Sequence, residues 1–408
     1  MAGVGAGGVG TLTAVRRISV EERRARLGRR QLLAPTRASP TPHEVAERLV
    51  ALHSSDPATV FLSVRARTGM KGVEPLERAL YDDRTLARIL AMRRTMFVVP
   101  VDLVPVLHAA ATQALVPAQR KRAIQMVEEA GISDDGAAWL RRAEKATLAA
   151  IERRGEATGA ELTKAVPELQ AQLTFGEGRR WGATSGVVTR VVWMLAMEGR
   201  IVRGRPRGSW ISSQYRWAPM EAFVPGGVGA VPVEEARAEL LRRWLYAFGP
   251  GTAADIRWWT GWTAKATTAA LAAVGAVEVD LDGVTGYVRP DDADPVNAPG
   301  PWIALLPGLD PTPMGWTQRD WYLGAHKAAL FDRSGNIGPS VWCDGRIVGG
   351  WGQRADGTVV YRLLDDMGAA RTRAVTDAAT ALTTWLQPVR VTPRFRTPLE
   401  RELADSRF

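Results

Sequence analysis

The segment His53-Ser54-Ser55-Asp56 places an imidazole, two hydroxyl groups and a carboxylate within four consecutive residues. Such a set can activate water: His53 would accept a proton from a water molecule held with Ser55, and Asp56 would supply negative charge near a positive centre. A purely structural explanation fits equally well. His53 would then end a helix, Ser55 would cap the next helix, and Asp56-Pro57 would form its first turn. The sequence leaves both interpretations open.

Arginine dominates the basic residues, since only six of the 53 Lys and Arg residues are lysines. Guanidinium groups bind phosphate in a planar, bidentate manner, although the codon usage of a GC-rich genome would also favour arginine. The candidate phosphate contacts lie between residues 179 and 207: Arg179, Arg180, Arg190, Arg203, Arg205 and Arg207. Proline stiffens the turn Arg205-Pro206-Arg207, so both guanidinium groups could reach a DNA backbone. The alternative is a solvated surface hairpin.

The net charge of +10 is unevenly distributed. Residues 1–139 carry +6 and residues 140–217 carry +7, whereas residues 218–299 carry −5 and residues 300–408 carry +2. A basic region of this kind is typical of a surface that binds a polyanion. We therefore expect a polyanion, namely double-stranded DNA, as the partner, and no obligate protein partner.

Metal and disulfide chemistry are not expected. Cys343 is the only cysteine, and the four histidines are scattered along the chain. A single cysteine cannot form an intrachain disulfide, and the histidines do not have the spacing of a zinc site. We therefore expect no metal and no cofactor. Of the fifteen tryptophans, Trp181, Trp193 and Trp210 could stack on an unpaired base, but core positions are favoured.

Two regions share one order of predicted elements. Helices are expected at 139–154, 159–165 and 184–198, followed by strands at 200–204 and 210–217. Three helices and a basic hairpin correspond to a winged helix-turn-helix unit, whose third helix enters the major groove. Helices at 232–247, 249–259 and 263–274, followed by a hairpin at 277–281 and 285–289, repeat this order in an acidic region. This copy is expected to support the assembly.

The remaining segments complete a prediction of an α+β, mostly α, fold. The N-terminal region predicts helices at 18–34, 43–54, 58–67, 74–82, 84–92 and 101–131, with a strand at 95–100. Short apolar runs between 301 and 363 suggest a small β-barrel or twisted sheet. The expected organisation is a disordered tail (1–17), winged-helix domains at 18–138, 139–220 and 231–295, and a C-terminal β-rich domain at 300–408. No uninterrupted apolar run or signal peptide is evident, so we expect a cytoplasmic, nucleoid-associated monomer.

A series of motifs covers most of the chain. They occupy residues 49–67, 92–100, 249–251, 306–311, 330–332, 345–349 and 391–395. Together they resemble the AlkZ/YcaQ-like winged-helix DNA glycosylases. The resemblance implies three tandem winged-helix domains around a DNA channel, a C-terminal β-rich domain, and excision of bulky alkylated or crosslinked purines.

The sequence departs from the family at its catalytic signature. The family carries a Gln-x-Gln or Gln-x-Asp pair, and the matching positions here are His53 and Ser55. Gln170-Ala171-Gln172 lies elsewhere and is treated as a coincidence. The leading hypothesis is a monofunctional DNA glycosylase for repair or genotoxin self-resistance. The alternatives are a non-catalytic DNA-binding protein that lost the Gln pair and, less favoured, a protein-interaction scaffold.

Overall fold

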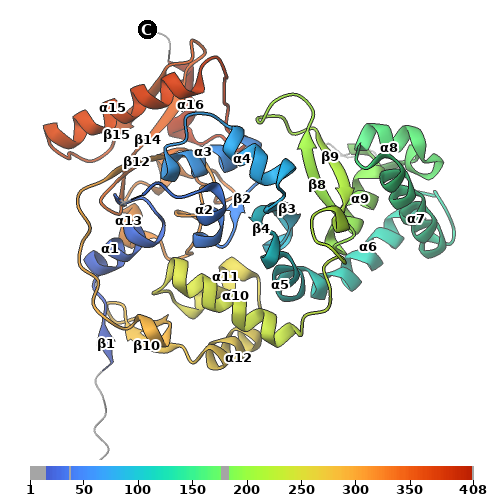
Figure 1. Ribbon diagram of the computed structural model, residues 1–408, viewed down its shortest axis with the longest axis horizontal. Coiled ribbons are helices and arrows are strands. Elements are labelled where there is room, and N and C mark those ends of the chain that lie inside the picture. The colour runs from blue at the N-terminus through green and yellow to red at the C-terminus, as the bar shows by residue number, and fades with distance from the viewer. Residues whose placement is uncertain (1–14, 36–37, 176–182, 407–408) are drawn as a thin grey trace, which may run out of the picture.

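The computed structural model describes residues 15–35, 38–175 and 183–406. It is a mixed α+β structure in which several sheets are surrounded by helices (Figure 1). The main hydrophobic core contains residues from the N-terminal region, from α10 (Val233–Phe248) and from the C-terminal sheet. These parts of the chain are therefore packed against one another.

The largest sheet combines strands from two regions of the chain. Its order is β2 (Leu52–His53), β4 (Met96–Pro100), β3 (Leu86–Leu90), β8 (Ile201–Pro206), β9 (Tyr215–Pro219) and β5 (Ala157–Thr158). β4 confirms the strand predicted at 95–100, whereas β3 replaces the helix predicted at 84–92. All five residues of β3 are buried, because the strand lies between β4 and β8. A short apolar run of this kind does not distinguish a buried strand from a buried helix.

The N-terminal helices are α1 (Val20–Arg30), α2 (Pro42–Arg48), α3 (Pro57–Thr68), α4 (Glu74–Glu77) and α5 (Val104–Leu107). The first three begin at a side-chain cap, whereas the short helices α4 and α5 do not. Thr41 and Glu44 form a capping box for α2, and the side chain of Asp56 caps α3. The helix predicted at 43–54 therefore ends early, because β2 pairs with β4 and places His53 in a strand.

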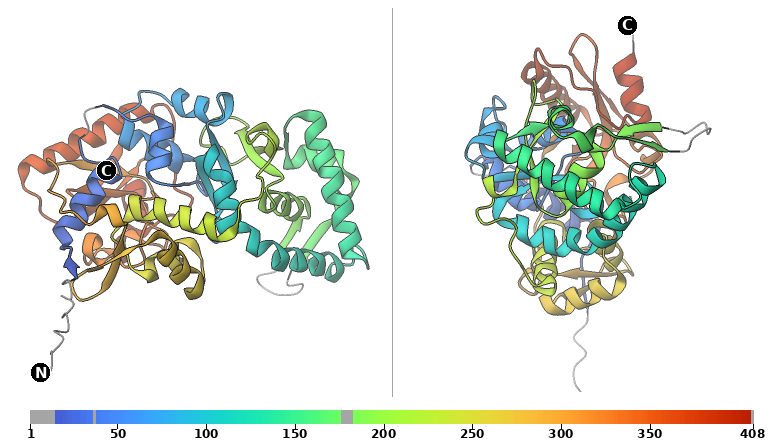
Figure 2. Two further views of the ribbon diagram at one scale, coloured as in Figure 1. Left: turned by 60° about the horizontal axis from the view of Figure 1, so that its bottom comes forward. Right: turned by 90° about the vertical axis from the view of Figure 1, so that its right-hand side faces the viewer.

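The second region forms the lobe on the right of Figure 1 and of the left view of Figure 2. Its helices and strands are α6 (Val116–Glu129), α7 (Gly136–Arg154), α8 (Gly159–Ala165), α9 (Val188–Met197), β6 (Gln172–Phe175) and β7 (Ala183–Gly186). The predicted capping box of Thr158 and Glu161 is present. Leu162, Val191 and Leu195 contribute to a separate core between these helices.

The third region contains the predicted order of three helices and a hairpin. These are α10, α11 (Ala253–Thr260), α12 (Ala264–Val274), β10 (Val277–Asp280) and β11 (Thr285–Val288). β1 (Arg16–Arg17) pairs in parallel with β10, so residues 16 and 17 form a strand and do not belong to a disordered tail. Residues 1–14 lie outside the described residues.

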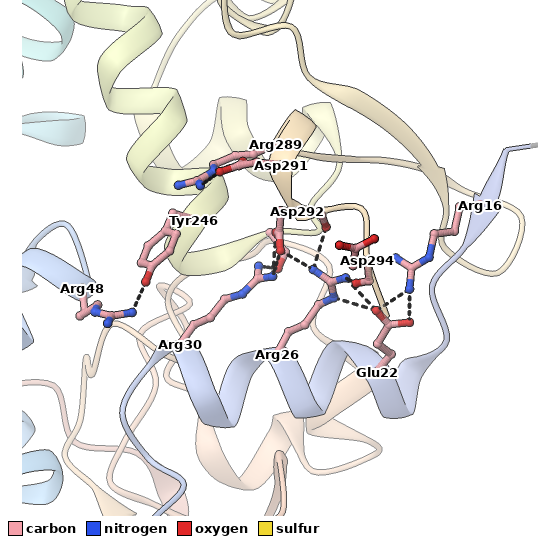
Figure 3. A network of polar contacts seen from close by, with 11 residues as sticks. Arg16, Glu22, Arg26, Arg30, Arg48, Tyr246, Arg289, Asp291, Asp292 and Asp294 are labelled. Carbon is pink, nitrogen blue, oxygen red and sulfur yellow. Dashed lines mark hydrogen bonds and ion pairs between the residues drawn. The ribbon is translucent and has the colours of Figure 1, made fainter. Parts of the chain in front are cut away.

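An ion-pair network fastens α1 to the loop after β11 (Figure 3). Arg26, whose side chain is 1% exposed, contacts Asp292 over 2.9 Å and Glu22 over 2.8 Å. Arg30 donates to both carboxylate oxygens of Asp292 over 2.6 and 2.7 Å. Charged groups this well enclosed need such partners to offset their desolvation.

The C-terminal region is an open sheet, so of the two expected forms, a small barrel or a twisted sheet, the described residues do not form the closed barrel. Four antiparallel strands run in the order β12 (Ile303–Leu306), β13 (Ser340–Cys343), β14 (Arg346–Gln353) and β15 (Val359–Leu363). The edge strands do not pair with each other, and α15 (Ala369–Leu386) packs against both of them. α16 (Pro398–Asp405) contacts β14 and β15, and the short helices α13 (Asp320–Leu323) and α14 (Lys327–Leu330) precede β13. Helices therefore cover the sheet where closure was expected.

The motif at 306–311 has a structural role in the core. Asp310 and Arg67 form a bidentate pair over 2.9 and 2.8 Å, and both side chains are fully buried. Burial acts to raise the pKa of Asp310, but the charge and hydrogen bonds of Arg67 lower it overall. This pair connects α3 to the turn that follows β12.

One helical stretch, Val101–Glu129, is long and apolar enough to cross a membrane by length and composition alone. It consists of short 3-10, π and α-helical pieces followed by the 14-residue helix α6. Leu103, Val104 and Leu107 of this stretch belong to the main hydrophobic core. A core helix meets the same criterion, so the stretch is weak evidence for a membrane span.

Candidate active site

The segment His53–Asp56 links the edge of the large sheet to α3. His53 pairs with Phe97 of β4, and the two rings meet edge to face with centroids 5.1 Å apart. The imidazole is 7% exposed. The start of α3, fixed by Asp56 and Pro57, turns the chain away from the sheet directly after these residues.

The environment of His53 keeps the imidazole neutral. Burial and the nearby positive charge of Arg93 lower the pKa of His53 to about 3. The backbone N–H of Ser55 donates to Nδ1 over 3.4 Å, which assigns the ring proton to Nε2. Nε2 has no partner among the described residues. His53 is therefore a hydrogen-bond donor with an available N–H and a weak base.

Asp56 is held by two backbone donors. One carboxylate oxygen accepts from the N–H of Ala58 over 3.1 Å, as expected of a helix cap. The other accepts from the N–H of Arg394 over 2.9 Å. Burial raises the pKa of Asp56 against the opposing effect of these hydrogen bonds. Asp56, and not Ser55, caps the helix.

Ser55 takes part in this arrangement through its backbone. Its carbonyl accepts from Nη1 of Arg394 over 3.2 Å. Its hydroxyl makes no hydrogen bond within the described part of the chain, so it is available to a ligand. The structure brings His53, Ser55 and Asp56 into one turn, but only the first two keep a polar group free.

Arg93, whose positive charge acts on His53, and two residues packed with it were not assigned to the site from the sequence. The guanidinium carbons of Arg93 and Arg319 lie 4.2 and 4.8 Å from the ring centroid of Trp258. Nε of both arginines is buried without a hydrogen-bond partner, as is Nη2 of Arg319. Trp258 was expected to be a packing residue, yet it is only half-buried. Burial, and then the charge of Arg319, lower the pKa of Arg93.

The backbone of Arg93 is also unusual, with φ of 52° in the left-handed region. Arg93 lies in the motif at 92–100, to which the sequence analysis assigned no role. Its partners come from α11 and from residue 319, so no local pattern could associate them.

The predicted phosphate-binding arginines fall into different environments. Arg179 and Arg180 lie outside the described residues. Arg190 and Arg203 are half-buried beside aromatic rings, and burial together with neighbouring charges lowers the pKa of Arg203 to about 10. Arg205 pairs with Asp82 over 2.8 Å and with Glu77 over 3.5 Å. Arg207 is exposed and forms no ion pair among the described residues.

The hairpin of β8 and β9 is docked against the protein. β8 pairs with β3 through Arg203 and Arg88. In the loop between the two strands, Trp210 is 7% exposed, with ring centroids 5.1 Å from Phe61 and 5.7 Å from Trp385. Trp210 is thus a core residue, and the hairpin spans from the second region to α3 and α15.

Within the described ranges, no three His, Cys, Asp or Glu side chains are grouped so that they could hold a metal ion. The groups around His53 are instead hydrogen-bond donors, one carboxylate and guanidinium groups. Such a site can orient a water molecule and bind phosphate. These are the requirements for hydrolysis on a nucleotide that has been turned out of a duplex.

Comparisons with known proteins agree with this chemistry. Residues 46–385 match the family described as DNA glycosylase AlkZ-like. The interstrand DNA cross-link repair glycosylase of Streptomyces sahachiroi is 26% identical over 342 residues, which cover 79% of this chain and 84% of that protein. The solved structure of Streptomyces sahachiroi DNA glycosylase AlkZ is 23% identical, with a TM-score of 0.70, covering 90% of this chain and 97% of that one. The chain belongs to the AlkZ-like DNA glycosylase family.

Proposed function

We propose that this protein is a monofunctional DNA glycosylase that hydrolyses the N-glycosidic bond of bulky or alkylated purines. The observation that carries the proposal is a neutral His53 at the position of the family's catalytic pair, with a free Nε2–H and with the half-buried guanidinium of Arg93 near enough to lower its pKa. The matched relative is named as a cross-link repair glycosylase. The proposed setting is repair or genotoxin self-resistance in the cytoplasm, with the protein acting as a monomer on damaged duplex DNA.

In the proposed mechanism, His53 positions a water molecule and does not deprotonate it. A group with a pKa of about 3 is a poor proton acceptor, but its Nε2–H can hold a water oxygen together with the hydroxyl of Ser55. The bond from the sugar carbon to the purine breaks, and the purine leaves with the bonding electrons. Water then attacks the oxocarbenium-like sugar carbon and loses its proton to solvent.

Arg93 and Arg319 would bind the phosphates that flank the extruded nucleotide. Their buried N–H groups have no protein partner, and satisfying such donors with phosphate oxygens is favourable. Ionised Asp56 would add negative charge near the positive sugar. Its main contribution is to fix the turn, since both of its oxygens accept backbone hydrogen bonds.

The proposed architecture is three tandem winged-helix units, at 18–138, 139–220 and 231–295. The order of helices and hairpin in the second and third regions supports it. The hairpin of the second unit is packed on the first, so its contribution to DNA binding would come from Arg207 and the neighbouring exposed backbone and not from a free wing.

The test is base release from duplex DNA carrying N7-alkylguanine or a bulky intercalator-type adduct. The unchanged protein should release free base and leave abasic sites, and His53→Ala should abolish release while keeping DNA affinity. His53→Gln, which restores an amide donor at the family's Gln position, should recover part of the activity.

A second candidate function is a non-catalytic damage binder or regulator. It is favoured by the absence of the Gln pair and by the engagement of both Asp56 oxygens in the fold. Tight, salt-sensitive binding without base release across several lesions would support this alternative and overturn the glycosylase.

A further inference from the structure

A groove in the C-terminal region borders the candidate active site. It has a volume of about 720 Å³ and is formed by two segments far apart in the sequence, 331–334 and 394–401. Its walls include Phe331 and Phe395 and the arginines 333, 394, 396 and 401. Both segments contain motifs that the sequence singled out, 330–332 and 391–395, and that the proposed mechanism leaves unused.

The first segment is a rigid turn that presents Arg333. One carboxylate oxygen of Asp332 accepts from the N–H groups of Ser334 and Asn336, each over 2.8 Å. The other accepts from Nδ2 of Asn336 over 2.8 Å. The carboxylate of Asp332 is therefore engaged by hydrogen bonds within its own turn and does not pair with Arg333.

The guanidinium groups of three of the four arginines form no ion pair among the described residues. Arg333, Arg394 and Arg401 are exposed and form no ion pair in the described part of the chain. Arg396 differs, because it pairs with Glu400 over 2.7 Å and with Asp405 over 3.3 Å. The groove thus carries excess positive charge, on arginine side chains that extend from hydrogen-bonded segments of the chain. Such a surface is suited to binding phosphate groups.

The groove is directly connected to the candidate active site. Arg394 donates through its backbone N–H to Asp56 and through Nη1 to the carbonyl of Ser55. The guanidinium carbon of Arg319 also lies 5.0 Å from the ring centroid of Phe331, which lines the groove. A strand lying in the groove would therefore run past the turn that holds His53.

We infer that this groove binds the phosphodiester backbone of DNA next to the nucleotide that occupies the His53 site. The inference rests on the proposed function for the identity of the ligand. Arg333 and Arg401 each contact a phosphate, and Arg394 joins the bound backbone to the catalytic turn. Half-buried Phe395, with the guanidinium of Arg394 5.9 Å from its ring, provides an apolar surface for the sugar.

The experiment compares two double variants of the full chain. Arg333→Gln with Arg401→Gln removes two charges from the groove but leaves Arg394, which supports Asp56. The matched control is Arg29→Gln with Arg373→Gln, which removes two exposed arginines of α1 and α15 that form no ion pair among the described residues. Binding of undamaged fluorescent duplex is measured from low to moderate salt, with thermal unfolding as a check on folding.

The slope of log K against log salt should become shallower by about 1.8 in the groove variant, since each phosphate contact contributes about 0.9. The control should keep the slope of the unchanged protein. Equal slopes in the two folded double variants would overturn the proposal that the groove binds the DNA backbone, whether or not the protein releases base. If the groove variant has a shallower slope but the unchanged protein releases no base, the groove binds DNA and only the proposed glycosylase activity is overturned. Failure of the unchanged protein to bind DNA would overturn both.

Discussion

The backbone N–H of Arg394 donates to the carboxylate of Asp56 over 2.9 Å, so the C-terminal region closes the turn that begins α3. Asp56→Ala should lower the free energy of unfolding by about 2–4 kcal/mol, because it removes a helix cap and leaves a partly buried N–H without an acceptor. Urea denaturation measures this loss. Ser55→Ala is the matched control and should change stability by less than about 0.5 kcal/mol. Equal urea midpoints for the two variants would contradict the structural role of Asp56.

The depressed pKa of His53 predicts a specific dependence of stability on pH. The folded value of about 3 lies below the unfolded value of about 6.5, so the unfolded chain binds the additional proton between these limits. Stability is therefore highest above about pH 6.5 and decreases as the pH falls toward 3. Between pH 7 and pH 5 the unchanged protein should lose about 2 kcal/mol more than His53→Gln. Denaturant unfolding at the two pH values gives this difference.

The same pKa predicts how base release depends on pH. Because His53 stays neutral from pH 5 upward, the single-turnover rate should show no inflection near 6.5 that arises from this residue. An ascending limb near 6.5 that disappears in His53→Gln would show that His53 titrates as a base. It would also rule out the positioning role proposed above.

Local patterns in the sequence predicted the elements that are stabilised locally. The capping box of Thr158 and Glu161 and the β-branched strand at 95–100 were both correct. β3 was missed because its environment is tertiary. Arg88 in this strand is 1% exposed and lies over the ring of Tyr215, 127 residues away. A charged residue among apolar ones gave no sign that it would be enclosed in the middle of a sheet.

The residues of the candidate site differ in the same respect. His53, Ser55 and Asp56 lie within four consecutive residues and can be recognised as a motif. Arg319 and Trp258 join Arg93 only through packing between distant segments. The choice between a barrel and an open sheet was left undecided for a related reason: strand lengths and turns are visible in the sequence, but the placement of α15 over both edge strands is not.

The buried ion pairs of Arg26 between α1 and the loop after β11 (Figure 3) should contribute more to stability than an exposed ion pair elsewhere. Arg26→Met removes a guanidinium that is 1% exposed and should lower the free energy of unfolding by about 1.5–3 kcal/mol, because Glu22 and Asp292 each lose a charged hydrogen-bond donor. Arg17→Met breaks the exposed pair with Asp282 and should cost at most about 1 kcal/mol. Chemical denaturation of both variants tests this. Similar losses would show that the enclosure of Arg26 does not matter to stability.

Arg205 and Arg207 are two residues apart, and the structure predicts different effects of their substitution on DNA binding. Arg205 is already paired with Asp82 and Glu77 and lies 4.7 Å from the ring centroid of Tyr81, so Arg205→Gln should leave the salt dependence of binding unchanged. Arg207 is exposed without an ion pair among the described residues, and Arg207→Gln should make the slope of log K against log salt shallower by about 0.9. Titrations of undamaged duplex over a range of salt concentrations give both slopes. A loss of slope in Arg205→Gln alone would mean that Arg205 leaves its carboxylates to bind DNA and that the docked hairpin opens in the complex.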